Sequence, residues 1–139
     1  MPIDEQVRVF VYGTLKPGEA NYQKYCAGKV VDSTKALALG ELFALPMGFP
    51  AMTPGKSPVH GYLLSFANSE ILIDLDDLED YQPARPDSAN LYYRQQIEVY
   101  EIYDQQRSLC LAWVYLMSKE LVDQLGGVIQ TDGWWSQCV

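Results

Sequence analysis

The stretch from Phe10 to Gly18 has the composition of a loop that can bind an oxygen atom through its backbone. A strand-like alternation of Val7, Val9 and Val11 with larger or polar residues leads into it. Gly13 then leaves the backbone uncovered, Thr14 adds a hydroxyl, and Pro17-Gly18 closes the turn. If the free N–H groups of this loop converge, they can hold an anionic or carbonyl oxygen. The alternative is an ordinary connection between a strand and a turn.

A glutamate about 65 residues later is the best candidate for acid–base chemistry. The spacing predicts a helix over residues 70–81, with Ile71, Leu72, Leu75 and Leu78 on one face and Asp76, Asp77 and Asp80 on the other. Glu79 falls between Leu75 and Leu72, within the apolar stripe. Desolvation, the negative helix end and the neighbouring Asp80 would all raise its pKa, which suits a general base or acid near neutral pH. Alternatively, the helix end frays and Glu79 is solvated.

The composition of the chain excludes several classes of protein. At 139 residues and 48% hydrophobic content, we expect a single domain over residues 1–139. The formal net charge of -8 argues against nucleic-acid or anionic-membrane partners. No stretch approaches the ~20 apolar residues of a membrane span, and the start of the chain lacks the basic residues of a signal peptide, so we expect a cytoplasmic protein.

Cysteine and histidine are too sparse to favour a metal site or a histidine-based nucleophilic mechanism. The 3 cysteines, Cys26, Cys110 and Cys138, are widely spaced and form no C-x-x-C pair. The single histidine, His60, has no neighbouring cysteine or second histidine with which to share a metal. A disulfide framework, a zinc site and a Ser-His-Asp or Cys-His mechanism are therefore disfavoured.

The remaining patterns predict an α+β fold: a small, mixed, largely antiparallel β-barrel with short flanking helices. Strands are expected over residues 29–32, 35–45, 59–66, 92–103 and 107–117, the last two as a hairpin, and short helices over 19–25 and 118–125. Residues 46–55 and 82–90 are expected to be loops, the first lining a pocket or else plugging one end of the core. Trp134-Trp135 should dock onto the body of the domain.

With these pieces placed, the sequence resembles the gamma-glutamylcyclotransferase-like family, which includes gamma-glutamylamine cyclotransferases and plant AIG2-like proteins. The resemblance rests on residues 11–16 (VYGTLK), 48–51 (GFPA), 75–81 (LDDLEDY) and Tyr93-Arg94, in this order over most of the chain. It departs at Asp80, where many relatives have glycine, and residues 132–134 (DGW) match a Gly-Asp-Trp ending only loosely.

The resemblance implies a function and a set of site residues. Glu79 would be the catalytic glutamate, and Tyr12, Gly13, Thr14 and Leu15 would bind substrate. Tyr81 and Tyr93 either line the pocket or are ordinary barrel aromatics. Arg94 could pair with the substrate carboxylate, although we favour a structural role in which it neutralises acids on a neighbouring strand.

The implied reaction is an intramolecular aminolysis. The α-amino group of a gamma-glutamyl amine or gamma-glutamyl amino acid attacks its own γ-carbonyl, giving 5-oxoproline and a free amine, with neither metal nor cofactor. Two alternatives stay open: a non-catalytic module that binds a small metabolite on the same fold, and an interaction protein that uses its acidic surface. The leaving group and the oligomeric state do not follow from the sequence.

Overall fold

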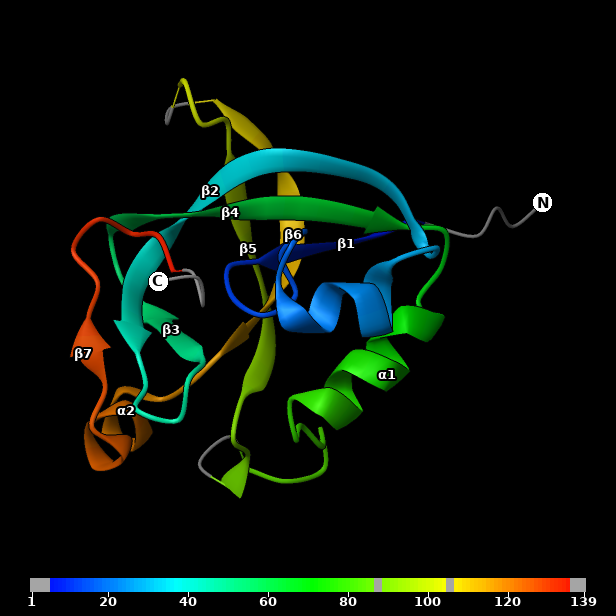
Figure 1. The fold of residues 1–139 in the computed structure, drawn as a ribbon. Coiled ribbons are helices and arrows are strands. Elements are labelled where there is room, and N and C mark those ends of the chain that lie inside the picture. The colour runs from blue at the N-terminus through cyan, green and yellow to red at the C-terminus, as the bar shows by residue number, and fades with distance from the viewer. Residues whose placement is uncertain (1–5, 87–88, 105–106, 136–139) are drawn as a thin grey trace.

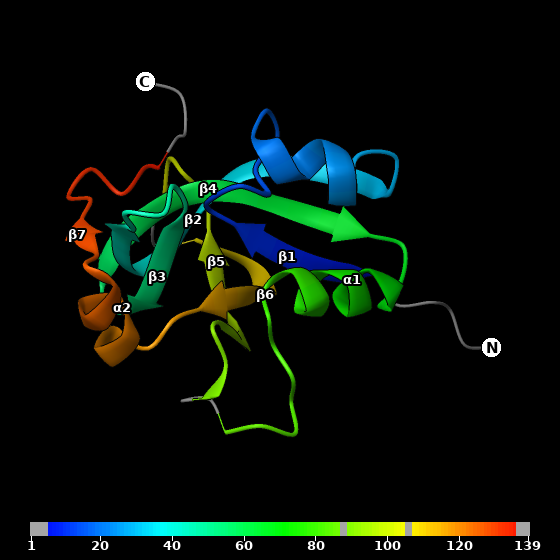
Figure 2. The same ribbon diagram turned by 60° about the horizontal axis from the view of Figure 1, so that its bottom comes forward.

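The computed structural model describes residues 6–86, 89–104 and 107–135. Its elements are β1 (Val7–Val11), the π-helix η1 (Tyr22–Cys26), β2 (Val30–Ala44), β3 (Pro50–Pro54), β4 (Ser57–Phe66), α1 (Glu70–Leu78), β5 (Tyr93–Tyr100), β6 (Ser108–Leu116), α2 (Lys119–Leu125) and β7 (Val128–Ile129). This arrangement of strands with few, short helices confirms the predicted α+β class. Figures 1 and 2 show α1 and α2 at opposite ends of the sheet.

The strands form a largely antiparallel sheet whose ends meet. Their order is β3-β2-β4-β1-β6-β5, and β2 also pairs with β5 through Leu37↔Tyr100 and Ala38↔Val99. The five strands β2, β4, β1, β6 and β5 therefore form a closed ring of pairings, as expected for the predicted barrel. The pairing of β1 with β6 is parallel, and β7 adds to β2. Figure 1 shows the long β2 and β4 curving side by side.

The C-terminal part of β1 and the residue after it are buried on both faces, because a core cluster lies on either side of the sheet there. Val9 and Val11 belong to one hydrophobic cluster, whereas Phe10 and Tyr12 belong to a second. All four side chains are at most 6% exposed. The alternation of Val7, Val9 and Val11 is typical of a strand with one face in a core, so it describes one half of the packing around this strand.

The expectation of a loop over residues 46–55 is wrong for its second half, which forms β3. Pro50 and Pro54 stand at the two ends of this strand and pair with Ala44 and Gly40 of β2. Proline is tolerated at the ends of an edge strand, because the N–H that it lacks is not needed there for hydrogen bonds between strands. The structure also joins the two strands expected over 29–32 and 35–45 into the single strand β2, with an irregularity between Val30 and Asp32.

The short helices differ in how closely they follow expectation. The helix expected over 19–25 is the π-helix η1, and the helix at 118–125 is present as α2. The Ser118 hydroxyl accepts a hydrogen bond from the N–H of Leu121, and Gly126 ends α2 with a φ of 80°. Among the described residues, no helix is both long and apolar enough to span a membrane.

Candidate active site

The glycine loop and the predicted glutamate line the same cavity. It has a volume of about 260 Å³ and is bounded mainly by apolar and aromatic residues. Its lining comes from the end of β1 and the loop after it, the residues just before η1, the turn before β3 with the first residue of that strand, the end of α1, the segment before β5, and β6. The lining residues are Phe10, Val11, Tyr12, Gly13, Thr14, Leu15, Ala20, Asn21, Gly48, Phe49, Pro50, Leu78, Glu79, Leu91, Tyr92 and Tyr115. The strand ends and the α1 terminus therefore meet around one space.

The loop after β1 keeps its N–H groups available. The N–H of Lys16 donates to the Gly13 carbonyl at 3.0 Å and closes the turn. Asn21 holds Thr14 from two sides: its side-chain amide donates to the Thr14 hydroxyl at 2.9 Å, and its backbone N–H donates to the Thr14 carbonyl at 2.8 Å. Within the described residues, no acceptor is found for the N–H groups of Gly13, Thr14 or Leu15. These three groups are the donors that the loop can offer to a ligand.

Close packing against Pro50 explains why residue 13 is glycine. A Cβ atom built on Gly13 would lie 2.6 Å from Cγ and 2.9 Å from Cδ of Pro50. A proline ring cannot swing away as a flexible side chain would. Any larger residue at position 13 must therefore displace either the loop or the start of β3, and both of these line the cavity.

Glu79 lies at the C-terminus of α1 and is held there by the helix itself. Helix α1 ends at Leu78, and the N–H of Glu79 still donates to the Leu75 carbonyl at 2.9 Å. The side chain is half-buried and borders the cavity. Burial raises the pKa of its carboxyl from 4.5 to about 7. Of the three causes expected from the sequence, desolvation is the one that produces this shift.

Three tyrosines surround Glu79, and each hydroxyl is already committed to a protein acceptor. Tyr12 donates to the Tyr115 carbonyl at 2.6 Å, Tyr92 to the Pro50 carbonyl at 2.6 Å, and Tyr115 to Asp76 at 2.7 Å. Burial raises the pKa of all three hydroxyls well above 10, and the Glu79 charge acts in the same direction. They are therefore neutral near pH 7. Within the described lining, Glu79 is the group that can exchange a proton there.

The structure separates the predicted site residues into two sets. Tyr12, Gly13, Thr14, Leu15 and Glu79 border the cavity, whereas Tyr81 and Tyr93 are not among the residues that line it. The Tyr81 ring centroid is 5.5 Å from the guanidinium of Arg94. Tyr93 packs against the second core cluster. Tyr92, the chain neighbour of Tyr93, does line the cavity, and the other aromatic residues of the lining come from other segments.

Arg94 has the structural role favoured from the sequence, but its partner lies on a helix. Its guanidinium donates two hydrogen bonds to the Asp76 carboxylate, at 2.8 and 3.1 Å. Asp76 was expected on the solvent face of the helix. That expectation is wrong, because the carboxylate is only 17% exposed and also accepts the Tyr115 hydroxyl. The favourable partners come from β5 and β6, so the helical pattern alone could not reveal them.

Asn21, Tyr92 and Tyr115 were not identified from the sequence as site residues. Asn21 could have been noticed, because an amide side chain just after a turn often bonds the turn backbone. Tyr92 and Tyr115 are indistinguishable in the sequence from core aromatics of a hairpin. Which of them faces a cavity depends on how the strands curve around it.

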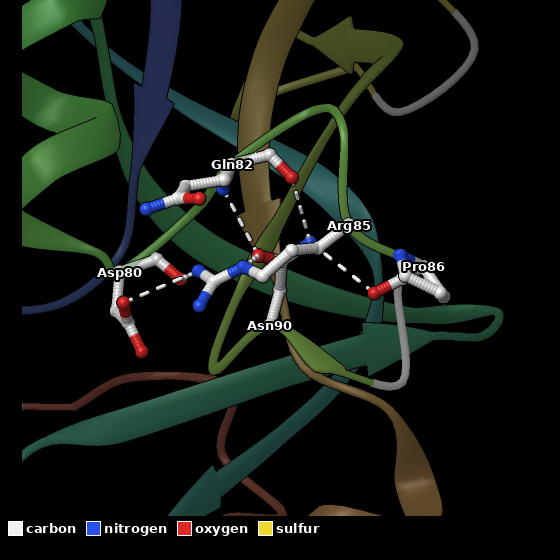
Figure 3. Close-up of polar contacts among 5 residues, drawn as sticks. All are labelled: Asp80, Gln82, Arg85, Pro86 and Asn90. Atoms are coloured by element: carbon white, nitrogen blue, oxygen red, sulfur yellow. Dashed lines mark hydrogen bonds and ion pairs between the residues drawn. The ribbon is translucent and has the colours of Figure 1, made fainter.

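Residue 80 adopts a backbone conformation that favours glycine. Asp80 has a φ of 53°, the one positive value among the described non-glycine residues. Arg85 holds it by donating to the Asp80 carbonyl at 2.8 Å and to its carboxylate at 3.2 Å (Figure 3). Arg85 also bonds Asn90, a buried residue that accepts from the N–H of Gln82 at 2.9 Å. This network connects Asp80, which follows Glu79, to Asn90, which precedes Leu91, and both Glu79 and Leu91 line the cavity.

The residue that ends the glycine loop is a buried lysine bound to Trp134 and Trp135. Lys16 is 1% exposed; its ammonium donates to the Trp135 carbonyl and lies 3.4 Å from the centroid of the Trp134 ring. Burial lowers its pKa to about 8, while Glu19 acts in the opposite direction. Trp135 is buried, which confirms docking for this residue, and Trp134 is 40% exposed. The ammonium therefore joins the loop to residues far along the chain.

The fold and site together define a small α+β protein with one carboxyl and a set of backbone donors around an apolar cavity. The family model of gamma-glutamyl cyclotransferases of the AIG2-like type matches residues 9–137. The chain is also 31% identical over 112 residues to the gamma-L-glutamyl-butirosin B gamma-glutamyl cyclotransferase of Niallia circulans, a match that covers 81% of this chain and 67% of the relative. This chain belongs to the AIG2-like gamma-glutamyl cyclotransferase family.

Solved structures support the same fold. An AIG2-like protein from Mus musculus superposes with a TM-score of 0.66 at 22% identity, over 91% of this chain and 87% of that one. YkqA from Bacillus subtilis superposes with a TM-score of 0.65 at 20% identity, over 94% of this chain. This chain spans 40% of the length of YkqA. At these identities the likeness concerns the fold.

Proposed function

We propose that the protein converts a gamma-glutamyl amine or a gamma-glutamyl amino acid into 5-oxoproline and the free amine, with Glu79 as general acid and base. The observation that carries the proposal is the shared cavity: a carboxyl whose pKa is about 7 borders the same space as the N–H groups of Gly13 to Leu15. Near neutral pH such a carboxyl is present in both protonation states, so it can accept a proton and return it.

The reaction needs one proton acceptor, one proton donor and a binding site for a developing negative charge. The substrate α-amino nitrogen attacks the γ-carbonyl carbon, forming the ring C–N bond, and its proton passes to the Glu79 carboxylate. The bond between the γ-carbon and the leaving nitrogen then breaks, and Glu79 returns the proton to that nitrogen. The oxygen of the tetrahedral intermediate would be held by the loop N–H groups, each worth about 3 kcal/mol by analogy with other oxyanion sites.

The surroundings of the cavity support the remaining requirements. Apolar and aromatic walls exclude water, which strengthens hydrogen bonds to the developing charge. Holding the glutamyl chain folded brings nucleophile and carbonyl together, and proximity of this kind lowers barriers substantially. These residues supply proton transfer, charge stabilisation and orientation, so we propose that the reaction proceeds without a metal ion.

Glu79→Gln tests the assignment of the base. The substitution preserves size and hydrogen bonding but cannot take a proton, so we expect 5-oxoproline formation to fall by at least about 100-fold. The assay incubates the purified protein with gamma-glutamylamines and gamma-glutamyl amino acids, with and without a chelator, and quantifies 5-oxoproline. Asp77→Asn removes an exposed acid from the same helix and serves as the matched control.

The outcomes of this assay separate the alternatives. A Glu79→Gln protein with wild-type turnover would show that another group is the base. A wild-type protein that binds these compounds tightly and releases no 5-oxoproline would be a binding module. Loss of activity in chelator, restored by a divalent metal, would contradict the metal-independent reaction.

A further inference from the structure

Tyr115 joins the two halves of the cavity through two different polar groups. Its hydroxyl donates to Oδ1 of Asp76, on helix α1, at 2.7 Å. Its backbone carbonyl accepts the hydroxyl of Tyr12, the residue before Gly13, at 2.6 Å. Its ring borders the cavity between them. One residue of strand β6 thus contacts both the helix that carries Glu79 and the segment that leads into the glycine loop.

On the helix side, the contact lies within one turn of Glu79. Asp76 precedes Glu79 by three residues, so the two side chains are neighbours on the helix surface, about one turn apart. Its carboxylate is also bound by Arg94, whose guanidinium lies 4.5 Å from the centroid of the Trp113 ring. Both partners of this ion pair are less than one-fifth exposed. The Asp76 carboxylate therefore connects the C-terminal turn of α1 to both β5 and β6.

On the loop side, Tyr12 is fixed by two hydrogen bonds to one hydroxyl. The Tyr12 hydroxyl donates to the Tyr115 carbonyl, and its oxygen accepts a hydrogen bond from the N–H of Met52 at 3.2 Å. Tyr12 is 6% exposed, so neither bond can be replaced by bulk water without opening the core. The backbone that leads into Gly13 is thereby held against β6 and against β3.

Resting on the activity proposed above, we propose that Tyr115 is a positioning residue that sets the distance between the Glu79 carboxyl and the N–H groups of Gly13 to Leu15. Both must act on one substrate, and misplacement of a reacting group by about 1 Å can cost roughly 100-fold in rate. Glu79 follows a helix of 9 residues whose backbone holds its N–H, and the position of that helix end relative to the sheet depends on contacts with β5 and β6. Through Asp76, the Tyr115 hydroxyl connects this helix end to β6, in addition to the bonds from Arg94 on β5.

Tyr115→Phe removes this connection and little else. The phenylalanine ring still lines the cavity, and the backbone carbonyl still accepts the Tyr12 hydroxyl. Asp76 keeps Arg94 but loses its bond from β6. We expect kcat to fall roughly 10- to 100-fold while KM changes less than about 3-fold, because the loop donors stay in place and the carboxyl does not.

The pH profile gives a readout that simple destabilisation would not move. The titratable side chains that face Glu79 are Tyr12, Tyr92 and Tyr115, all neutral near pH 7. A less restrained helix end admits water to the Glu79 carboxyl, so the acidic limb of kcat/KM should move from about 7 towards 4.5 in Tyr115→Phe. A ¹³C NMR titration of the Glu79 carboxyl should show the same downward shift.

The matched control is Val114→Ala. Val114 is the neighbouring residue of β6; it is fully buried and does not line the cavity. Its truncation destabilises the core but leaves both Tyr115 bonds intact, so the acidic limb and the NMR titration should match wild type. Circular dichroism and thermal denaturation establish that both variants are folded.

The positioning role of Tyr115 and the proposed cyclotransferase activity can be disproved separately. An inactive wild-type protein would overturn the cyclotransferase activity, and the NMR titration would still test the positioning role of Tyr115. Positioning is overturned if Tyr115→Phe keeps the wild-type Glu79 titration, or if Val114→Ala shifts it equally. With an active enzyme, wild-type kcat in Tyr115→Phe would also overturn it.

Discussion

Burial of the Glu79 carboxyl links the stability of the protein to pH. Its pKa is 4.5 when solvated and about 7 in the fold, so the folded state favours the protonated form. Between these values the unfolded chain has released its proton while the folded chain retains it. The contribution of Glu79 to the free energy of unfolding therefore falls as pH rises from 4.5 to 7, by about 1 to 3 kcal/mol, and stays low above pH 7.

Glu79→Gln should remove the loss of stability that the buried, charged Glu79 carboxylate causes at high pH. We expect the variant to be more stable than wild type at pH 8, and the stability difference between the two to shift in favour of wild type as pH falls to 4.5. Urea denaturation of both proteins at pH 4.5, 6 and 8 measures it, because the other carboxylates cancel in the difference. A difference that is the same at all three pH values would mean that the Glu79 carboxyl is well hydrated in the folded protein.

At the scale of single residues, the sequence predicted what depends on neighbours in the chain. The position of Glu79 within the apolar stripe follows from the helical repeat, and burial of its carboxyl follows from that position. The burial of Asp76 does not, because its partners Arg94 and Tyr115 lie 18 and 39 residues away. The sequence also could not predict that Tyr92 and Tyr115 face the cavity, because this depends on the curvature of the sheet.

At the scale of elements, the turn that ends α1 is strained at Asp80. Glycine adopts a φ of 53° without penalty, whereas other residues lose roughly 1–2 kcal/mol there. Asp80→Gly and Asp80→Ala both lose the exposed contact from Arg85 to the carboxylate, and both keep the bond to the backbone carbonyl. A comparison of the two variants therefore isolates the backbone strain.

We expect Asp80→Gly to be more stable than Asp80→Ala by about 1 kcal/mol, the reverse of the usual order in helices. Thermal or chemical denaturation of the two variants gives the difference. An alanine variant at least as stable as the glycine variant would indicate that the turn rearranges to a negative φ. Because Glu79 directly precedes this turn, the same rearrangement should also alter the Glu79 titration.

Elements supported by local patterns were predicted well, whereas two short strands defined only by their pairing with β2 were missed. Helix α1, helix α2 and the hairpin of β5 and β6 have their own periodicity, caps or turn residues. Strand β3 contains two prolines and exists because β2 provides its ladder. Strand β7 has only two residues and is also defined by its pairing with β2. No local pattern distinguishes such a segment from a loop.

At the scale of the whole molecule, the closed ring of strands explains how distant segments meet. The pairing of β2 with β5 closes the ring, and the parallel pairing of β1 with β6 places the glycine loop beside Tyr115. The sequence predicted a curled sheet from the number of strands and the short connections. It could not give the order of the strands, since that order depends on contacts between residues far apart in the chain.

The contact of Lys16 with Trp134 and Trp135 has a consequence for biosynthesis. The ammonium and its carbonyl acceptor are 119 residues apart in the chain. At about 5–20 residues per second, a ribosome needs roughly 6 to 24 s to make that length. Throughout this interval Lys16 has neither its acceptor nor its aromatic partner, so the glycine loop should reach its final form late. An amine-reactive ester should acylate Lys16 in nascent chains stalled before residue 134, whereas chains released with Trp135 in place should resist acylation there, because Lys16 is buried.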